Sequence, residues 1–166
     1  MPTETLHHER RFSAGIFFIL AGIFLVMAGF LVAQLVLGPL GSKPAPTWLL
    51  AVFTGVFLLP MLNFAFLTLT LTTAGVRVAY GVFSSFRRWD QLTAVERDAE
   101  EGFYGWGIRF GKYRGQWVWV YNTIGGDRVA FVTTGAKPRG LLVTTADPER
   151  VVALARERLK PEVTSP

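Results

Sequence analysis

The sequence predicts a membrane α-helical hairpin plus an all-β domain: two transmembrane helices, then a small β-barrel or sandwich capped by a C-terminal amphipathic helix. Three observations predict this fold class. Two runs, Phe12–Ser42 and Pro44–Val76, contain no charged residue and are separated only by Lys43. From Leu67 onward apolar residues recur at every second position, as in a strand. Near the C-terminus the apolar period lengthens to that of a helix.

The overall composition agrees with a membrane protein and excludes two classes of site. Only 17% of the residues are charged, against about 25% in an average soluble domain. There is no cysteine, which excludes a disulfide framework and a cysteine-based metal site. The net charge of +5 is modest, and basic residues are mixed with acidic ones. This charge pattern does not predict nucleic-acid binding.

The two apolar runs are each long enough to cross a bilayer, which takes about 20 residues of helix. The first helix is predicted over residues 12–37 and ends at a Gly-Pro-Leu-Gly sequence, and the second is predicted over residues 47–66. Arg10 and Arg11 precede the first run, as in a signal peptide, but the run exceeds the roughly 7–15 residues of such a segment. We therefore expect a retained helix, with residues 1–11 and 161–166 as tails and residues 67–160 as the β domain.

The basic residues near the helix ends predict the orientation. The loop between the helices has Lys43 alone, whereas the outer ends carry Arg10, Arg11, Arg77, Arg87 and Arg88. By the positive-inside rule both termini should lie in the cytoplasm, in a multi-pass protein of the cell inner membrane.

The first helix contains an Ala-Gly pair that recurs every seven residues. Seven residues are nearly two helical turns, so the pairs form one stripe of small side chains. Small side chains let neighbouring helices approach closely in lipid. We expect the stripe to pack against Ala51 and Gly55 of the second helix; the alternative is a docking surface for a partner helix or a second copy. The stripe consists of Ala14, Gly15, Ala21, Gly22, Ala28 and Gly29.

The second half of the chain predicts strands separated by turn residues, at the spacing of a sandwich or barrel. The predicted strands are Leu67–Thr72, Val76–Phe83, Arg87–Asp90, Leu92–Asp98, Gly107–Lys112, Gln116–Asn122, Arg128–Thr134 and Leu141–Thr145. Asp147-Pro148-Glu149 then has the features of a helix start. The helix that follows has one apolar face and ends before Pro161.

Four stretches carry a resemblance to a known family: LTLTTAGVRVAYGVF, FRRWDQLTAVERD, GWGIRF and ADPERVVALARERL. They resemble the small bacterial membrane proteins in which two transmembrane helices precede a pleckstrin-homology-like (PH-like) domain. The resemblance covers nearly the whole chain, but the connection TGAKPRG is longer than usual there. It implies a PH-like barrel and a membrane-anchored, non-enzymatic protein.

A candidate partner surface lies on the strand Gln116–Asn122. Trp117, Trp119 and Tyr121 share one face of this strand, and Trp106 lies nearby in sequence. Exposed aromatic residues are typical of protein-interaction and membrane-interface surfaces. The alternative is that they pack in the core, as most strand aromatics do.

A basic patch of Arg87, Arg88 and Arg109 is a candidate contact for anionic lipid; the alternative is that these arginines only set the membrane topology and solvate the surface. Cations near the cytoplasmic leaflet gain about 1 kcal/mol each from anionic lipids. His7 and His8 lack a fixed third ligand, so no metal site is predicted. No catalytic residue, cofactor or metal is predicted, and no nucleic-acid partner.

The sequence therefore predicts a non-catalytic protein that presents an interaction surface at the membrane. The expected role is an accessory or assembly subunit of a membrane complex, with a membrane-protein partner or a homo-oligomer as its assembly. The alternative is an anionic-lipid-binding or envelope-stress module. A small transporter or membrane enzyme would usually carry ionisable residues at membrane depth, and neither apolar run contains one.

Overall fold

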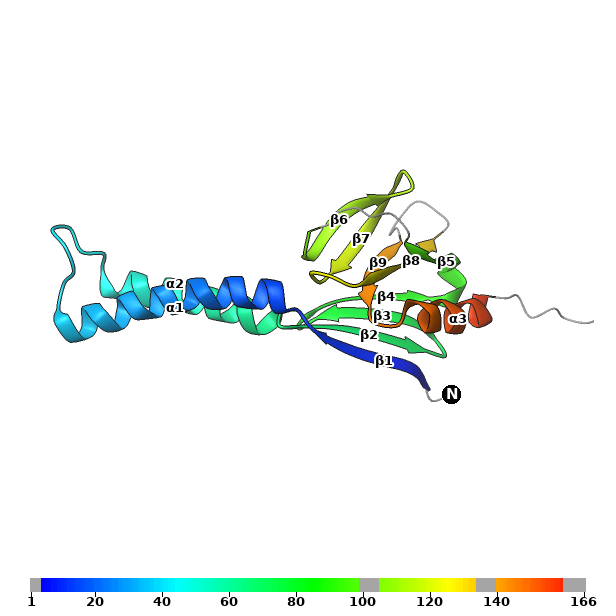
Figure 1. The fold of residues 1–166 in the computed structure, drawn as a ribbon, viewed down its shortest axis with the longest axis horizontal. Coiled ribbons are helices and arrows are strands. Elements are labelled where there is room, and N and C mark those ends of the chain that lie inside the picture. The colour runs from blue at the N-terminus through cyan, green and yellow to red at the C-terminus, as the bar shows by residue number, and fades with distance from the viewer. Residues whose placement is uncertain (1–3, 99–104, 134–139, 160–166) are drawn as a thin grey trace, which may run out of the picture.

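The computed structural model describes residues 4–98, 105–133 and 140–159, and it shows a β domain from which two helices project (Figure 1). The helices are α1 (Ala14–Leu37), α2 (Thr47–Asn63) and α3 (Pro148–Leu159), with one 3₁₀ turn at Trp89–Gln91. The strands are β1 (Thr5–Phe12), β2 (Phe66–Thr72), β3 (Gly75–Tyr80), β4 (Phe83–Arg88), β5 (Leu92–Asp98), β6 (Gly107–Tyr113), β7 (Gln116–Asn122), β8 (Asp127–Thr133) and β9 (Leu141–Thr145).

The strands form two separate sheets. The first sheet has the order β1-β2-β3-β4, and all its neighbours are antiparallel. The second has the order β5-β8-β9-β7-β6, in which β7 and β9 are parallel and the other neighbours antiparallel. In both sheets one face is apolar, because apolar residues alternate along the strands.

The hydrophobic core lies between the inner faces of the two sheets. The first sheet contributes alternate residues of β2 and β3, and the second contributes residues from β5, β7, β8 and β9. Val151 and Ala155 of α3 add to the same core and are fully buried. The core residues of the sheets include Leu67, Leu69, Leu71, Val76, Val78, Tyr80, Val95, Tyr121, Val129, Phe131, Leu141 and Val143.

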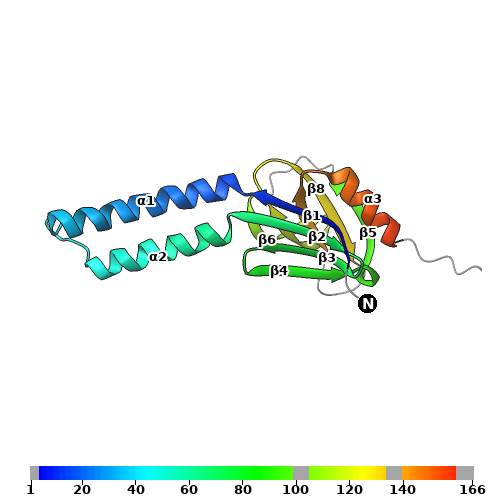
Figure 2. The same ribbon diagram turned by 90° about the horizontal axis from the view of Figure 1, so that it is seen from below.

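The helical projection, residues 14–64, is an insertion into a β-hairpin. β1 leads directly into α1, α2 leads into β2, and Phe12 pairs with Phe66 where the two strands meet the helices. Ser13 N donates a hydrogen bond to Ala65 O at 2.8 Å. The two helices lie side by side and extend away from the sheets in both views (Figure 2). The projection thus leaves the β domain and returns to it at one place.

The predicted pair of transmembrane helices is wrong. Of the described helices, only α1 is long and apolar enough to cross a membrane. α2 has 17 residues, which span about 26 Å at 1.5 Å per residue, against a hydrocarbon core of about 30 Å. It is shorter than predicted because Asn63 turns into the β domain, where its Oδ1 accepts a hydrogen bond from Val82 N at 2.9 Å.

The predicted barrel is also wrong, because both sheets are open. The first ends at β1 and β4, and the second ends at β5 and β6, and none of the described strands pairs with a strand of the other sheet. The 3₁₀ turn at Trp89–Gln91 separates β4 from β5 and carries the chain from one sheet to the other. Closure would need these edge strands to pair. Instead, α3 packs beside β5 and β8 and covers the core there (Figure 1).

The predicted N-terminal tail contains an additional strand. Residues 5–12 form β1 and pair with β2 along its whole length. The segment has two histidines and three charged residues and lacks the apolar alternation that predicts a strand. It forms because β2 offers an unpaired edge, and charged residues are common on edge strands.

Most other element positions agree with the prediction. β5, β7 and β9 have the predicted bounds, and α3 ends at Leu159. The main difference is that the predicted strand Val76–Phe83 is divided by a turn at Gly81 and Val82 into β3 and β4. The long connection of the TGAKPRG stretch lies outside the described residues, apart from Gly140.

Candidate functional site

The two sheets separate on the side opposite α3 and leave a groove between β4 and the β6-β7 hairpin. Its volume is about 750 Å³, within the roughly 300–1,000 Å³ of typical ligand pockets. We call it the inter-sheet groove. It is lined by Phe64, Val82, Phe83, Ser84, Ser85, Phe86, Arg87, Ile108, Trp119 and Tyr121.

β4 forms one wall of the groove through its inward-facing side chains. Ser85 pairs with Val78 and Arg87 pairs with Val76 in the ladder between β3 and β4. Val76 and Val78 are fully buried in the core. Since directly opposite residues point to the same face of a sheet, Ser85 and Arg87 point toward the second sheet. β4 is the last strand of its sheet, so this part of the inner face lies at the rim of the core.

The opposite wall is aromatic. Trp119 and Tyr121 of β7 face β4, and the Ser85 and Tyr121 hydroxyls form a hydrogen bond of 2.6 Å across the groove. Phe110 packs against Trp119 with ring centroids 4.0 Å apart, which extends the aromatic surface along β6. More than half of the Phe110 side chain is exposed. An exposed aromatic surface of this kind is typical of binding sites.

Among the described residues, Arg87 is the one cation that lines the groove, and only 8% of it is exposed. Its Nη1 donates a hydrogen bond to Phe86 O at 2.8 Å. Burial lowers the pKa of the Arg87 guanidinium, because removal from water disfavours the charged form. Arginine keeps its charge at neutral pH, so the groove contains a partly desolvated positive charge.

The groove lies at the root of the helical projection. Asn63, the last residue of α2, binds the β3-β4 turn through Val82 N and Tyr80 O. Gly81 in this turn has a φ of +50°, and a side chain there would overlap Asn63. Phe64 stacks on Phe83 with centroids 5.9 Å apart. The turn, the end of α2 and the groove therefore form one packed unit.

A buried polar contact also fixes α1 to the two sheets. The Tyr80 hydroxyl lies 3.2 Å from Ser13 Oγ and 3.0 Å from Asn122 O, so it joins β3, the start of α1 and the end of β7. Burial raises the pKa of Tyr80. Gly15 packs so closely on Ile124 that a side chain at this position would overlap it. These contacts hold the projection in a fixed position on the β domain.

The predicted partner surface is divided by the structure. Trp119 and Tyr121 line the groove. Trp117 lies farther along the same face of β7, 43% exposed, with Lys112 Nζ 5.2 Å from its ring centroid. Trp106 lies just before β6 and is also exposed. Tyr121 is nearly fully buried, which fits the packing alternative that the sequence left open.

The predicted basic patch is divided in the same way. Arg87 faces the groove, whereas the neighbouring Arg88 points to the other face of β4 and pairs with Asp90 at 2.7 Å. Arg109 lies on β6, and its Nη1 is close to the backbone of Gly105. Of the three arginines, Arg87 is the one that lines the groove.

The stripe of small residues on α1 lies partly on the free surface. Ala21 and Ala28 are half-buried, whereas Gly22 and Gly29 are exposed. Among the described residues, no atom beyond their own helix backbone and chain neighbours lies within 4 Å of a Cβ built on either glycine. The same holds for Gly55 of α2. The contact between α1 and α2 therefore leaves these glycines uncovered.

Sequence reasoning missed most of the groove, because only Arg87, Trp119 and Tyr121 of its ten described lining residues were predicted as site residues. Phe64, Val82, Phe83 and Ile108 were not predicted as site residues, although they form its apolar end. The available signal was Gly81, which suits a two-residue hairpin loop between two apolar strands. Without that turn, the register that aims Arg87 into the groove could not be derived.

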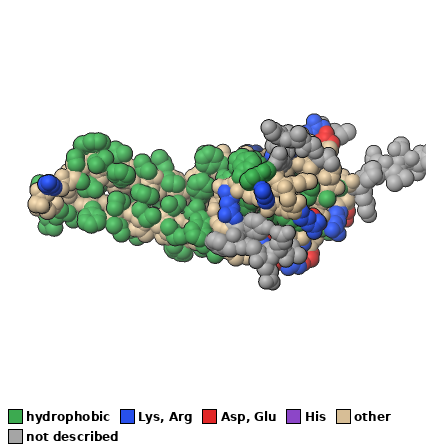
Figure 3. Space-filling model, turned by 90° about the horizontal axis from the view of Figure 1, so that it is seen from above, with side chains coloured by type: hydrophobic (Ala, Val, Ile, Leu, Met, Phe, Trp, Pro, Cys, Tyr) green, Lys and Arg blue, Asp and Glu red, His purple; other side chains and the backbone are tan. Residues whose placement is uncertain are grey.

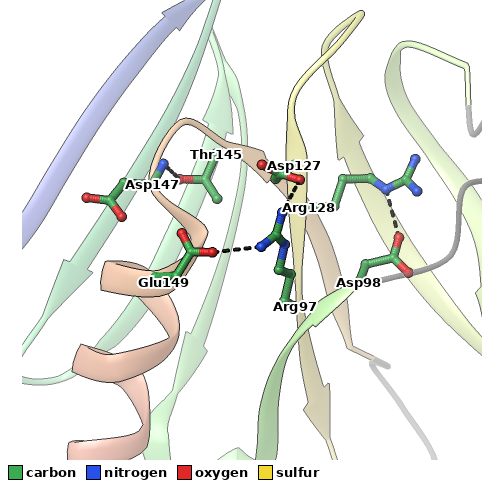
Figure 4. A network of polar contacts seen from close by, with 7 residues as sticks. All are labelled: Arg97, Asp98, Asp127, Arg128, Thr145, Asp147 and Glu149. Carbon is green, nitrogen blue, oxygen red and sulfur yellow. Dashed lines mark hydrogen bonds and ion pairs between the residues drawn. The ribbon is translucent and has the colours of Figure 1, made fainter.

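On the α3 side, a network of ion pairs joins β5, β8 and α3 (Figure 4). Arg97 binds Asp127 at 2.8 Å and Glu149 at 2.7 Å, and all three side chains are at least half exposed. Arg128 Nε donates to Asp98 Oδ2 at 2.7 Å, and the Asp98 side chain is fully buried. This network stabilises the α3 side of the sandwich and lies away from the groove.

No protein-family model, curated protein or solved structure matches this chain. The resemblance to PH-like bacterial membrane proteins therefore stays a prediction. Among the described residues, no group of three or more His, Asp or Glu side chains could hold a metal ion. None of the described groove-lining residues is His, Asp or Glu. Such a lining suits the binding of an apolar ligand.

Proposed function

We propose that this protein is a membrane-anchored, non-catalytic binding module. In this proposal α1 anchors the protein in a lipid bilayer, and the inter-sheet groove binds the ligand. One observation carries the proposal: the groove opens at the root of the projection, where Asn63 and Phe64 join α2 to the β3-β4 turn. Insertion of α1, which starts at the same root, would therefore place the groove at the membrane surface.

The surface of the projection supports membrane insertion. α1 is long and apolar enough to cross a membrane, and none of its residues is buried in the protein. On the face shown in Figure 3, hydrophobic side chains cover the projection, while Lys, Arg, Asp and Glu gather mainly on the β domain. A helix that is apolar all round needs either a protein core or lipid around it. Since α1 lies outside the core, lipid is the environment that fits it.

A cleaved signal sequence near the N-terminus would have the same apolar composition as α1. The position of β1 is the argument that α1 is retained in the mature protein. β1 precedes α1 and pairs with β2 over residues 5–12. Cleavage after α1 would remove β1 and leave the apolar β2 as the edge of its sheet. Exposed apolar edges promote aggregation, so the folded β domain favours a retained α1.

The charges at the two ends of the projection support a cytoplasmic position for the β domain. Arg10 and Arg11 lie at the root, where the Arg10 guanidinium stacks 3.8 Å from the Phe66 ring centroid. Lys43 is the one charged residue in the loop at the far end. By the positive-inside rule the root, with the groove, belongs on the cytoplasmic side of the inner membrane.

A second candidate is the accessory or assembly subunit of a membrane complex. It is favoured by the exposure of Gly22 and Gly29 on α1, where a partner helix could approach closely. The two candidate functions differ in the molecule that is bound and in where it binds. A binding module carries a ligand in its groove, whereas a subunit carries a stoichiometric protein on its helices.

Membrane extraction tests the proposed function. The full chain, expressed in bacterial cells, should stay with the membranes after an alkaline wash. A hairpin-closed variant, in which Asn-Gly replaces residues 14–64, should be released. Purification of the full chain in mild detergent, followed by mass spectrometry, then distinguishes the candidates. Release of the full chain by the wash would contradict membrane anchoring, and a stoichiometric partner protein would favour the accessory subunit.

A further inference from the structure

We propose that the inter-sheet groove holds one acyl chain of an anionic phospholipid from the adjoining bilayer, with the acidic headgroup at Arg87. The inference rests on the proposed function, because the groove reaches lipid only if the projection is inserted. It names the ligand of the site.

The apolar end of the groove fits an acyl chain. Phe64, Phe83 and Ile108 line this end, and Val82 beside them is 83% exposed. Large exposed apolar side chains in a concave site are unfavourable in water and are usually covered by a ligand. A volume of about 750 Å³ accommodates an extended hydrocarbon chain.

The apolar end of the groove lies near the root of the projection, and its cationic end lies farther from the root. A phospholipid that is partly drawn out of the bilayer has the same order, with its acyl chain toward the bilayer and its headgroup away from it. Phe83 lies at the root of the projection, next to Phe64. Arg87 lies four residues farther along β4, which corresponds to about 13 Å in a strand. A phospholipid whose acyl chain lies at the Phe83 end of the groove, toward the bilayer, therefore has its headgroup at Arg87.

The charge of the site selects an anionic headgroup. Among the ten groove-lining residues that the structure describes, Arg87 is the one cation, and none is a carboxylate. The guanidinium lines the groove, so a ligand with an anionic group there meets a positive charge. Guanidinium also matches a phosphate group in geometry, since both can share two parallel hydrogen bonds.

The polar groups of the groove favour lipid over a peptide. A peptide brings a backbone N–H and C=O at nearly every residue, and each needs a partner when it is buried. The groove offers few neutral side-chain partners, because the hydroxyls of Ser85 and Tyr121 already bind each other. An acyl chain has no such requirement. We therefore assign the groove to lipid, with a protein segment as the competing outcome.

Photo-crosslinking tests the assignment with the full chain in lipid nanodiscs. The probes are phosphatidylglycerol and phosphatidylcholine that carry a diazirine in one acyl chain, and adducts are located by mass spectrometry. We expect phosphatidylglycerol adducts on residues 82–87 and 119–121, and phosphatidylcholine adducts mainly on α1. Adducts on α1 report membrane insertion separately from occupancy of the groove.

Two variants of adjacent residues isolate the charge. Arg87→Gln should lower the phosphatidylglycerol adducts in the groove about tenfold, since a charge-assisted hydrogen bond is lost, and leave those on α1. Arg88→Gln should change neither, because Arg88 points away from the groove and pairs with Asp90. The headgroup assignment would be overturned if phosphatidylglycerol labelled the groove of the Arg87→Gln variant as strongly as that of the unmodified chain. It would also be overturned if both lipids labelled the unmodified groove equally.

A third variant tests the acyl chain without a change of charge. Ile108→Trp should fill the apolar end and remove groove adducts of either lipid, while circular dichroism confirms that the sheets remain. In the unmodified chain, adducts on α1 with none in the groove would overturn the inference and leave membrane anchoring intact. A protein crosslinked in the groove in place of lipid would overturn it in favour of a protein partner. Absence of adducts on α1 would instead contradict the proposed function.

Discussion

At the residue scale, the two ion pairs of Arg97 and Arg128 differ mainly in their burial. The Arg97–Asp127 pair is half exposed, whereas Asp98, the partner of Arg128, has a fully buried side chain. An exposed ion pair is worth little, because water screens it and both side chains lose freedom. A buried pair is costly to break, because the remaining charge stays in the protein without compensation.

We therefore predict that the same Asp→Asn substitution destabilises the protein far more at the buried site than at the exposed one. Asp98→Asn should lower the free energy of unfolding by about 3 kcal/mol. Asp127→Asn should lower it by less than about 1 kcal/mol. Denaturant unfolding of both variants in the same detergent measures the difference. Equal losses would contradict the view that burial decides the strength of these pairs.

Tyr113 of β6 gives a prediction for alkaline pH. Burial, helped by the nearby charge of Glu96, raises the pKa of Tyr113 from 10.0 to about 12. Between these two values the unfolded chain loses the phenolic proton while the folded chain keeps it. The unfolded state then binds fewer protons, so stability falls as the pH rises through this range.

The Tyr113→Phe variant tests this dependence, because it removes the titrating group and keeps the ring. From pH 10 to pH 12 the free energy of unfolding should fall more steeply for the unmodified protein than for the variant. Absorbance of the tyrosinate ion should show one fewer late-titrating group in the variant. Parallel pH profiles would show that Tyr113 titrates normally in the folded protein.

At the element scale, the projection is the connection of a β-hairpin, and its removal should leave the hairpin closed. Ser13 and Ala65 lie opposite each other, with Ser13 N bound to Ala65 O at 2.8 Å. Asn-Gly in place of residues 14–64 gives a two-residue loop of the type that suits such strands. We predict that this hairpin-closed variant is soluble without detergent and keeps a β-sheet circular dichroism spectrum.

A matched variant that also lacks residues 1–13 provides the control. It leaves the apolar β2 as an exposed edge, so it should aggregate or unfold at lower denaturant concentration. If both variants behaved alike, the pairing of β1 with β2 would contribute little to the β domain. If the first variant aggregated, the projection would be needed for folding as well as for anchoring.

The elements that the sequence predicts well are those with a strong local period. β5, β7 and β9 match their predicted bounds, because alternation and turn residues mark both ends of each. β1 could not be predicted, since its pattern is polar and its formation depends on pairing with β2, whose paired residues lie 54 or more positions away in the chain. The end of α2 could not be predicted either, because Asn63 is drawn out of the apolar run by the distant β3-β4 turn.

The site shows the same limit. Trp119 and Tyr121 were predictable as a shared strand face, since the alternation of β7 is regular. That Arg87 faces them, and Arg88 does not, depends on the register of β4 against β3. This register follows from the turn at Gly81, which apolar residues on both sides conceal in the sequence.

At the scale of the whole molecule, the protein has an apolar end and a charged end, and the groove lies where they meet. This arrangement is the physical basis of both proposals. The projection has lipid as its suitable environment, and the root carries arginines, among them Arg10 and Arg11. The groove takes its apolar lining from the same root, through Phe64 and Phe83. Anchoring and ligand binding therefore depend on one geometry.

The last prediction concerns the side of the membrane on which the β domain lies. The chain has no cysteine, so one introduced thiol reports its own accessibility. Ala153→Cys places it on the exposed side of α3, in the β domain. Because arginines gather at the root and Lys43 stands alone at the far end, we expect a cytoplasmic β domain. A membrane-impermeant maleimide should label this cysteine only after the cells are permeabilised. Labelling in intact cells would place the β domain outside, where the groove would face the other leaflet and its arginine a different set of lipids.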